Sequence, residues 1–263
     1  MISITKYLFR LFLCHAAITK IGKKYQMKKN VSVFIDFDGT ITKKDIGDRL
    51  FIDYGEFEPW HTRLVNKEIG IKEYWHELTK RLDKNLTPEM IAEYALNFEV
   101  DAYFKQFVGY CQEKNYKVSI VSDGFDVYVL PILRNLGLDN LPIFINKLNF
   151  EANTFIPEFP GASESCDCLC ASCKRNSILS NTSSDDIFVF IGDGYSDYCA
   201  AEHSDIVFAK RHLAAYCNEK RIPHYPWSNF FDVLRLMKDI EKKKRFKTRH
   251  QAFLKRKKAF EVE

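Results

Sequence analysis

Two aspartates stand two residues apart in the segment DFDGTIT, which spans residues 36–42. Asp36 and Asp38 follow an apolar, β-branched run, and a glycine and a threonine come next. Side chains two residues apart in a strand point the same way, but the turn at Gly39 separates their directions. Paired carboxylates at the end of a strand bind a hard divalent cation, perform acid–base chemistry, or do both. Their position makes a pair of solvated loop acids the weaker interpretation.

Two further segments place polar groups directly after apolar runs. Ser122 and Asp123 precede Gly124, and a hydroxyl that leads into a helix N-terminus suits a phosphate oxygen. Asp193 and Asp197 lie four residues apart across a glycine turn in the segment IGDGYSDYCAA, residues 191–201. A divalent cation needs several oxygen ligands, so this second segment adds candidates for a metal site.

The elements that position these residues can be inferred from the apolar runs at 31–37, 116–124, 186–194 and 205–209. Runs without polar alternation are typical of strands that are buried on both faces of a parallel sheet. Helix-like sequence follows each run, which predicts an α/β fold built from βαβ units. In such sheets functional groups gather at the carboxyl ends of the strands, where the acids of three runs stand.

Residues 45–99 differ from the rest because their apolar side chains recur at helical spacing and strand signals are absent. Thr87 before Pro88 is a typical helix start. We therefore predict a core at 31–44 and 100–240 with a helical cap at 45–99 inserted after the first strand. A basic N-terminal extension at 1–30 and a basic C-terminal helix or tail at 241–263 flank these parts, and we expect helix from Asn229 to the end.

In this order and at these strand ends, the DxDGT box, the serine and the GDGxxD box resemble the haloacid dehalogenase superfamily of phosphohydrolases. The resemblance covers residues 31 to about 236. It implies a Rossmann-like core, a Mg²⁺ ion at the strand ends, and a phosphomonoesterase acting on a small phosphate ester. Asp36 would be the nucleophile that forms an aspartyl-phosphate, and Asp38 would protonate the leaving alcohol and then activate water.

The same resemblance assigns the other residues of the site. Mg²⁺ would be held by Asp36, the backbone carbonyl of Asp38, Asp193 and Asp197, and phosphoryl oxygens by Ser122 and the Gly124 amide, beside Asp123. The superfamily also uses a lysine to neutralise charge in the transition state. Lys147 and Lys174 both precede the last box. We select Lys174, because related enzymes place this lysine at the start of a helix.

An all-helical insertion at this position resembles the branch that contains phosphoserine phosphatase. The cysteine-rich segment before Lys174 and residues 208–233 look like the phosphatases of 2-hydroxy-3-keto-5-methylthiopentenyl-1-phosphate, a methionine-salvage intermediate. The box GDGYSDYC is also similar to phosphoethanolamine/phosphocholine phosphatases. Asp45, nine residues after Asp36, either contacts substrate from the cap or caps its first helix. Aromatic side chains of the cap are mostly core, and one or two could cover an apolar or cationic substrate group.

Four of the eight cysteines stand within the segment CDCLCASCK, at positions 166, 168, 170 and 173. Four thiolates could hold Zn²⁺, although the spacing is not that of paired CxxC knuckles. A local disulfide and unmodified thiols are the alternatives. The remaining cysteines are scattered among apolar residues, which fits a reducing, cytoplasmic setting.

The net charge of +4 is an average over unlike parts, because residues 1–30 and 241–263 each carry +7 and the middle carries −10. An acidic body excludes a uniformly basic nucleic-acid-binding domain, so no nucleic-acid partner is expected. The apolar stretch at 7–18 is too short for a membrane span. The first 30 residues are interpreted as a dispensable segment before Met27, an amphipathic surface helix, or a signal peptide. We interpret the C-terminal charge as a solvated helix that precedes a binding arm.

Two other functions compete with the phosphatase. A non-catalytic protein could use its basic ends to bind nucleic acid or an anionic membrane, but the intact acids of the boxes favour an enzyme. A phosphotransferase would use the same residues as a hydrolase. The chain could also act as a homodimer.

Overall fold

The structure is a computed structural model that describes residues 30–162, 168, 170–183 and 186–262. The interpretations of the N-terminal extension and of Cys166 fall outside the described residues. No helix in the described part of the chain is both long and apolar enough to cross a bilayer.

One sheet forms the centre of the described chain, with the strand order β4-β3-β2-β1-β5-β6-β7. Only β4 runs antiparallel to its neighbour, β3. The predicted α/β fold with a parallel core sheet is therefore confirmed. The strands are β1 (Val31–Ile35), β2 (Lys117–Phe125), β3 (Ile143–Glu151), β4 (Thr154–Glu158), β5 (Ile187–Gly192), β6 (Ile206–Ala209) and β7 (Tyr225–Pro226).

The register of the central strands explains why the three polar segments meet. Ile35 pairs with Ile120 of β2 on one side and with Ile191 of β5 on the other. The residues that follow these three positions along the chain therefore leave the sheet at the same edge. One difference from the sequence prediction is that β2 continues through Ser122 to Phe125, with a shift of register between Val121 and Phe125.

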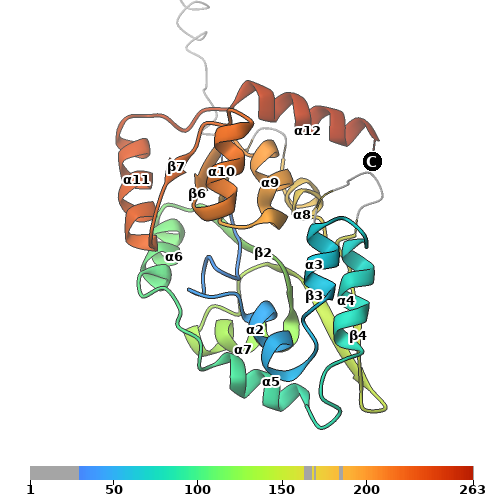
Figure 1. Cartoon of the computed structure of the whole chain (residues 1–263). Coiled ribbons are helices and arrows are strands. Elements are labelled where there is room, and N and C mark those ends of the chain that lie inside the picture. The colour runs from blue at the N-terminus through green and yellow to red at the C-terminus, as the bar shows by residue number, and fades with distance from the viewer. Residues whose placement is uncertain (1–29, 163–167, 169, 184–185, 263) are drawn as a thin grey trace, which may run out of the picture.

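Two helical layers cover the sheet, and alternation along β1 divides its side chains between them (Figure 1). Val31, Val33 and Ile35 face one apolar cluster, and Phe34 faces the other. The first layer contains α6 (Phe104–Glu113), α7 (Asp126–Leu136) and α11 (Phe230–Lys242), and the second contains α8 (Lys174–Ser180), α9 (Tyr198–His203), α10 (Arg211–Glu219) and α12 (His250–Val262).

The segment between β1 and α6 is helical, as its periodicity predicts. It contains α2 (Ile46–Tyr54), α3 (Trp60–Val65), α4 (Ile71–Thr79) and α5 (Pro88–Ala95). Thr87 caps α5 by accepting a hydrogen bond from the Met90 amide, with Pro88 in the first turn. An antiparallel bridge between Thr42 and Val100 joins the two chain segments that connect these helices to the sheet.

The C-terminal region differs from its prediction in two ways. Helix is interrupted at residues 243–249, where Lys244 has a φ of 53°. The helix α12 that follows is not simply solvated, because it packs beside α9 and buries Ala252, Arg256 and Ala259 (Figure 1). Its basic composition misled the prediction because one of the arginines pairs with an acid far away in the sequence.

Candidate active site

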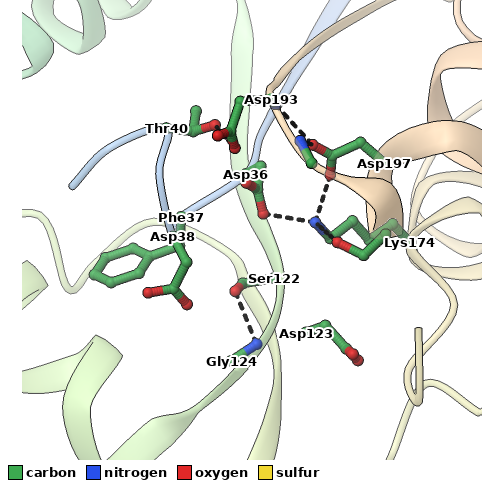
Figure 2. A network of polar contacts seen from close by, with 12 residues as sticks. Asp36, Phe37, Asp38, Thr40, Ser122, Asp123, Gly124, Lys174, Asp193 and Asp197 are labelled. Atoms are coloured by element: carbon green, nitrogen blue, oxygen red, sulfur yellow. Dashed lines mark hydrogen bonds and ion pairs between the residues drawn. The ribbon is translucent and has the colours of Figure 1, made fainter. Parts of the chain in front are cut away.

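Three buried aspartates meet at the carboxyl edge of the sheet. Asp36 follows β1, Asp193 follows β5, and Asp197 ends the short 3₁₀ helix η1 (Tyr195–Asp197). One carboxylate oxygen from each lies within 4.8 Å of the others. Figure 2 shows this group of acids around the end of β1. The adjacent strand ends thus bring together residues that are about 160 positions apart in the sequence.

Grouping these acids in the interior has an electrostatic cost. Burial raises the pKa of Asp36 well above its usual range, and the Asp197 and Asp193 carboxylates raise it further, while Lys174 lowers it. Burial and Asp197 likewise raise the pKa of Asp193. Carboxylates this close repel one another in a medium from which water is excluded. A bound cation is the direct way to relieve that repulsion.

Lys174, in the first turn of α8, supplies one positive charge to this group. Its Nζ lies 2.6 Å from Oδ1 of Asp36 and 2.9 Å from the Ser196 hydroxyl, and it also contacts Oδ1 of Asp197. Burial by itself would lower the pKa of Lys174, but Asp197 and Asp36 outweigh it and raise the pKa. The alternative candidate, Lys147, lies on the β3–β4 hairpin beside Glu158, with about half of its side chain exposed.

The second oxygen of Asp197 fixes the loop around it. Oδ2 accepts hydrogen bonds from the backbone amides of Asp193 and Gly194, at 2.8 and 2.9 Å. A Cβ on Gly192 would lie 2.3 Å from this oxygen, so the close approach requires glycine. Asp197 therefore holds both Lys174 and the backbone that presents Asp193.

Asp38 lies on a different side of Asp36 from Lys174 (Figure 2). Its Oδ1 accepts the Ile46 amide at 2.9 Å, and its Oδ2 accepts the Tyr128 hydroxyl at 3.1 Å. Burial raises the pKa of Asp38 well above its usual range, and the Asp45 carboxylate raises it further. These surroundings favour the protonated form of Asp38.

Ser122 and Gly124 lie opposite these acids on β2. The Gly124 amide donates to the Ser122 hydroxyl at 2.9 Å, and the serine is 2% exposed. A Cβ on Gly124 would come within 2.4 Å of the Tyr128 hydroxyl and 2.7 Å of Oδ2 of Asp38. A side chain at this position would therefore displace both groups.

Asp123 acts as a junction between the core, the cap and the loop before Lys174. Its Oδ1 accepts the amides of Ala171 and Ser172 at 2.8 and 3.1 Å, and the Asn146 side-chain amide at 3.0 Å. Its Oδ2 accepts the Trp75 indole N–H at 3.3 Å. Burial raises the pKa of Asp123 to about 6. These contacts favour a positioning role over direct contact with substrate.

Asp45 is a helix cap, which is one of the two alternatives that the sequence left open, and its contact with substrate stays a prediction. It caps α2, because its Oδ1 accepts the Asp48 amide at 2.8 Å, and it also lines the cavity above Asp36. Partial desolvation beneath the cap and the Asp48 carboxylate raise its pKa to about 7, although the side chain remains open to the cavity.

Seven of the nine predicted site residues border one cavity, and the other two, Lys174 and Asp197, contact residues that do. The cavity has a volume of about 570 Å³ and lies between the strand ends and helices α2 to α4. Its floor contains Asp36, Asp38, Ser122 and Asp193. Its cap side is apolar and aromatic, with Leu64, Val65, Ile71, Tyr74 and Trp75.

The haloacid dehalogenase-like hydrolase model matches residues 33–202, which is more than half of the chain. The chain belongs to this hydrolase family. The matched residues include both acid boxes, the serine and Lys174, so the resemblance inferred from these motifs is confirmed.

Curated relatives agree with the family and extend over most of the chain. A protein of Geobacillus kaustophilus is 30% identical over 218 residues, 82% of this chain and 99% of its own. One of Brevibacillus brevis is 29% identical over 218 residues, 82% of this chain and 98% of its own. Both are named 2-hydroxy-3-keto-5-methylthiopentenyl-1-phosphate phosphatase. The prediction of a phosphatase of this family is thereby confirmed.

Solved phosphoserine phosphatases share the fold. A phospho-aspartyl intermediate analogue of phosphoserine phosphatase has a TM-score of 0.60 and 18% identity, and covers 80% of this chain and 99% of that one. The enzyme from T. onnurineus has a TM-score of 0.57 and 17% identity, and covers 82% and 98%. At these identities the likeness shows the fold alone and nothing about substrate.

Three residues of the hydrolase site were missed by the sequence analysis. The Thr40 hydroxyl donates to Oδ1 of Asp193 at 3.1 Å, and Arg211 donates to its Oδ2 at 3.0 Å. Tyr128 holds Asp38, as described above. The rule that function gathers after parallel strands could have found Arg211, which follows β6 by two residues. Tyr128 gives no such signal, because it lies within a helix.

The donor set fits the divalent cation that this family implies. Asp36, Asp193 and Asp197 offer carboxylate oxygens, which hard cations such as Mg²⁺ prefer. Asp36 and Asp193 are held with raised pKa values that a cation would lower. Asp197 is engaged by the buried Lys174 and by two backbone amides, whereas Asp36 and Asp193 line the cavity directly and are the better placed ligands.

Proposed function

We propose that the protein hydrolyses a small phosphate monoester by forming an aspartyl-phosphate on Asp36. The observation that supports this most is the shared cavity in which Asp36, paired with Lys174, stands beside Asp38 with its raised pKa. A nucleophile must be ionised, and the acid that serves the leaving group must hold a proton. The Lys174 charge favours the first state, and burial beside Asp45 favours the second.

The reaction would proceed in two displacements at phosphorus. The Asp36 carboxylate attacks, the bond from phosphorus to the ester oxygen breaks, and Asp38 gives its proton to the departing alkoxide. Water then attacks phosphorus while Asp38 takes up a proton, and the bond to Asp36 breaks to release phosphate. Tyr128 and the Ile46 amide would keep Asp38 oriented in both steps.

The phosphoryl oxygens would be bound from several directions. Ser122 and the Gly124 amide would exchange their mutual hydrogen bond for bonds to the phosphate, and Lys174 would neutralise charge in the transition state. Asp36, Asp193 and the Asp38 carbonyl would hold Mg²⁺. Asp197 belongs to the same group of three carboxylates and would lie beside the ion. Bound there, Mg²⁺ would reduce the repulsion between the carboxylate nucleophile and the anionic substrate.

We propose 2-hydroxy-3-keto-5-methylthiopentenyl-1-phosphate as the substrate, on two grounds. The curated relatives named above share about 30% of their residues with this chain over nearly their full length. The cap side of the cavity is apolar at Leu64, Val65 and Ile71, which suits a thioether group. We propose the reducing cytoplasm as the compartment, because Cys111 and Cys217 are buried thiols outside any disulfide.

A phosphorylated amine such as phosphocholine or phosphoethanolamine is the second candidate. Tyr74 and Trp75 line the cavity together with Asp45 and Asp48. Aromatic faces and carboxylates attract an ammonium group. The same two acids would repel the carboxylate of phosphoserine, which places that substrate third.

The test is to measure kcat/KM with Mg²⁺ for the methylthiopentenyl ester, phosphocholine, phosphoethanolamine and phosphoserine. We expect the methylthiopentenyl ester to exceed the others by at least about 100-fold, because unmatched polar groups in a site are costly. Asp36→Asn should abolish turnover of every substrate. The matched control is Asp239→Asn, a half-exposed carboxylate on α11 that pairs with Lys243.

Two outcomes would contradict the proposal separately. Turnover retained in Asp36→Asn would refute the aspartyl-phosphate mechanism. Equally slow turnover of all four esters by the wild type would refute the substrate and leave the mechanism standing.

A further inference from the structure

Three cysteines of the segment before Lys174 turn their sulfur atoms toward one another. The Sγ atoms of Cys168, Cys170 and Cys173 all lie within 4.8 Å of each other, and those of Cys168 and Cys170 are 2.8 Å apart. Cys170 and Cys173 are buried, and Cys168 is half-buried. Cysteines that only fill space in a core have no reason to converge in this way.

The backbone that presents these thiols is anchored on two sides. Asp123 accepts the amides of Ala171 and Ser172, as described above. On the other side, the Cys173 amide donates to the Gly161 carbonyl at 2.8 Å, and the Gly161 amide donates to the Ser172 hydroxyl at 3.0 Å. Neighbouring residues thus hold the loop from outside the cluster, independently of the thiols.

The chemistry of the cluster favours a soft, tetrahedral metal ion. Thiolates bind Zn²⁺ at about 2.3 Å, which places neighbouring sulfur atoms about 3.8 Å apart in a tetrahedron. The three Sγ atoms lie within an ångström or so of that arrangement. Three anionic sulfurs crowded together without a cation would repel one another, and Cys170 would have to remain protonated.

We propose that Cys168, Cys170 and Cys173 form a structural Zn²⁺ site, separate from the carboxylate site that would bind Mg²⁺. The two sites differ in donor chemistry, because sulfur selects the softer ion and oxygen the harder one. Zn²⁺ binding releases the protons of the three thiols and leaves one coordination position for a further ligand.

The site would act on catalysis through Lys174, which directly follows Cys173. Fixing the sulfur of Cys173 fixes the start of α8, and with it the lysine that lies 2.6 Å from Asp36. This consequence rests on the proposed function, whereas zinc binding itself does not. The three cysteines are therefore positioning residues.

The first experiment measures metal in the full chain purified without chelators and under reducing conditions. We expect elemental mass spectrometry to find one equivalent of zinc per protein chain. Replacement by Co²⁺ should give the intense d–d absorption and the thiolate-to-cobalt charge-transfer band of a tetrahedral, sulfur-rich site. Excess Mg²⁺ should not displace the ion, because the donors are sulfur.

The variants are Cys168→Ser, at the least buried position, and Cys173→Ser, where serine remains a good residue to begin a helix. We expect both to lose zinc and the cobalt spectrum, with circular dichroism unchanged. The matched control is Cys199→Ser on α9, outside the cluster, which should retain one equivalent. If the enzyme acts as proposed, kcat should fall about 10- to 100-fold with little change in KM, as for residues that orient a site.

Wild-type chain without zinc, or zinc retained by both cluster variants, would overturn the metal site. A disulfide between Cys168 and Cys170 in the reduced preparation, detected by peptide mapping, would do the same. If the variants lose zinc and keep the wild-type kcat, the zinc site does not position Lys174. If the zinc-loaded wild type has no activity, the result contradicts the proposed phosphatase function and not the zinc site.

Discussion

Buried aspartates lie at both ends of the central sheet, and their surroundings differ. At the amino end, Asp205 accepts hydrogen bonds from the Phe188 and Arg249 amides and pairs with the Arg256 guanidinium at 3.1 and 3.2 Å. At the carboxyl end, Asp36 and Asp197 share one buried cation, Lys174, and Asp193 pairs with the half-exposed Arg211. The first acid has a buried cation of its own, whereas the three acids of the second group have one buried cation among them.

The difference distinguishes an aspartate that stabilises the fold from the aspartates that form the candidate active site. A buried charge is tolerated when it is paired and hydrogen-bonded, as Asp205 is. Carboxylates that are grouped with too few partners have raised pKa values, and such groups mark sites that receive a ligand. Burial alone would not have separated the two ends, since acids at both are less than a tenth exposed.

The sharpest test of this comparison exchanges one aspartate for asparagine at each end. Asp193→Asn should lower kcat/KM about 1000-fold, which corresponds to about 4 kcal/mol of lost charge stabilisation around the metal. Asp205→Asn should leave kcat of the folded enzyme unchanged and lower the free energy of unfolding. Steady-state kinetics and urea titration of both variants distinguish the cases, and equal loss of activity would break the comparison.

Removing the partner at the amino end should cost stability and spare catalysis. Arg256→Met leaves Asp205 buried without its guanidinium, so we expect the free energy of unfolding to fall by about 3 kcal/mol. Lys255→Met is the control, because this neighbouring lysine forms an exposed pair with Glu202, and its loss should cost less than about 1 kcal/mol. Chemical denaturation measures both. Similar losses would mean that α12 is not held through Arg256.

The pKa of Asp123 predicts a pH dependence at the carboxyl end. A carboxyl whose folded pKa rises from 3.8 to about 6 contributes stability that is complete below the unfolded pKa and is lost as the pH rises through 6. Asp123→Asn does not titrate and retains an acceptor for the Ala171 and Ser172 amides. Its stability relative to wild type should therefore increase between pH 4 and 7, by up to about 3 kcal/mol. Thermal unfolding across this range measures the difference, and a pH-independent difference would contradict the assignment.

Magnesium should stabilise the carboxyl end, where three acids meet, and leave the amino end unchanged, where Asp205 is paired with Arg256. At a concentration 100-fold above its dissociation constant, Mg²⁺ should add about 2.7 kcal/mol to the free energy of unfolding of the wild type. Asp205→Asn should show the same gain, and Asp193→Asn much less. Removal of Mg²⁺ with a chelator should abolish activity reversibly. An equal gain in all three proteins would place the ion elsewhere.

Much of the fold could be predicted because strands and helices leave local periodic signals. The runs that form β1, β5 and β6, and the helical spacing of residues 45–99, were evident in the sequence. So were Asp36, Asp38, Ser122 and Asp193, because strand ends specify which residues meet, whereas Lys174 was selected over Lys147 through the family resemblance. The prediction failed at α12, where composition indicated a solvated helix and Arg256 is 2% exposed.

Only the tertiary structure decided what the remaining residues contact. Asp123 reaches Trp75 and Ala171, each 48 positions away, and Tyr128 reaches Asp38 across 90 positions. Such partners are set by how helices and strands pack, and no local pattern encodes them. The sequence therefore determined which residues are capable of chemistry, whereas packing determined which acids are grouped around a shared cation and which have a buried cation of their own.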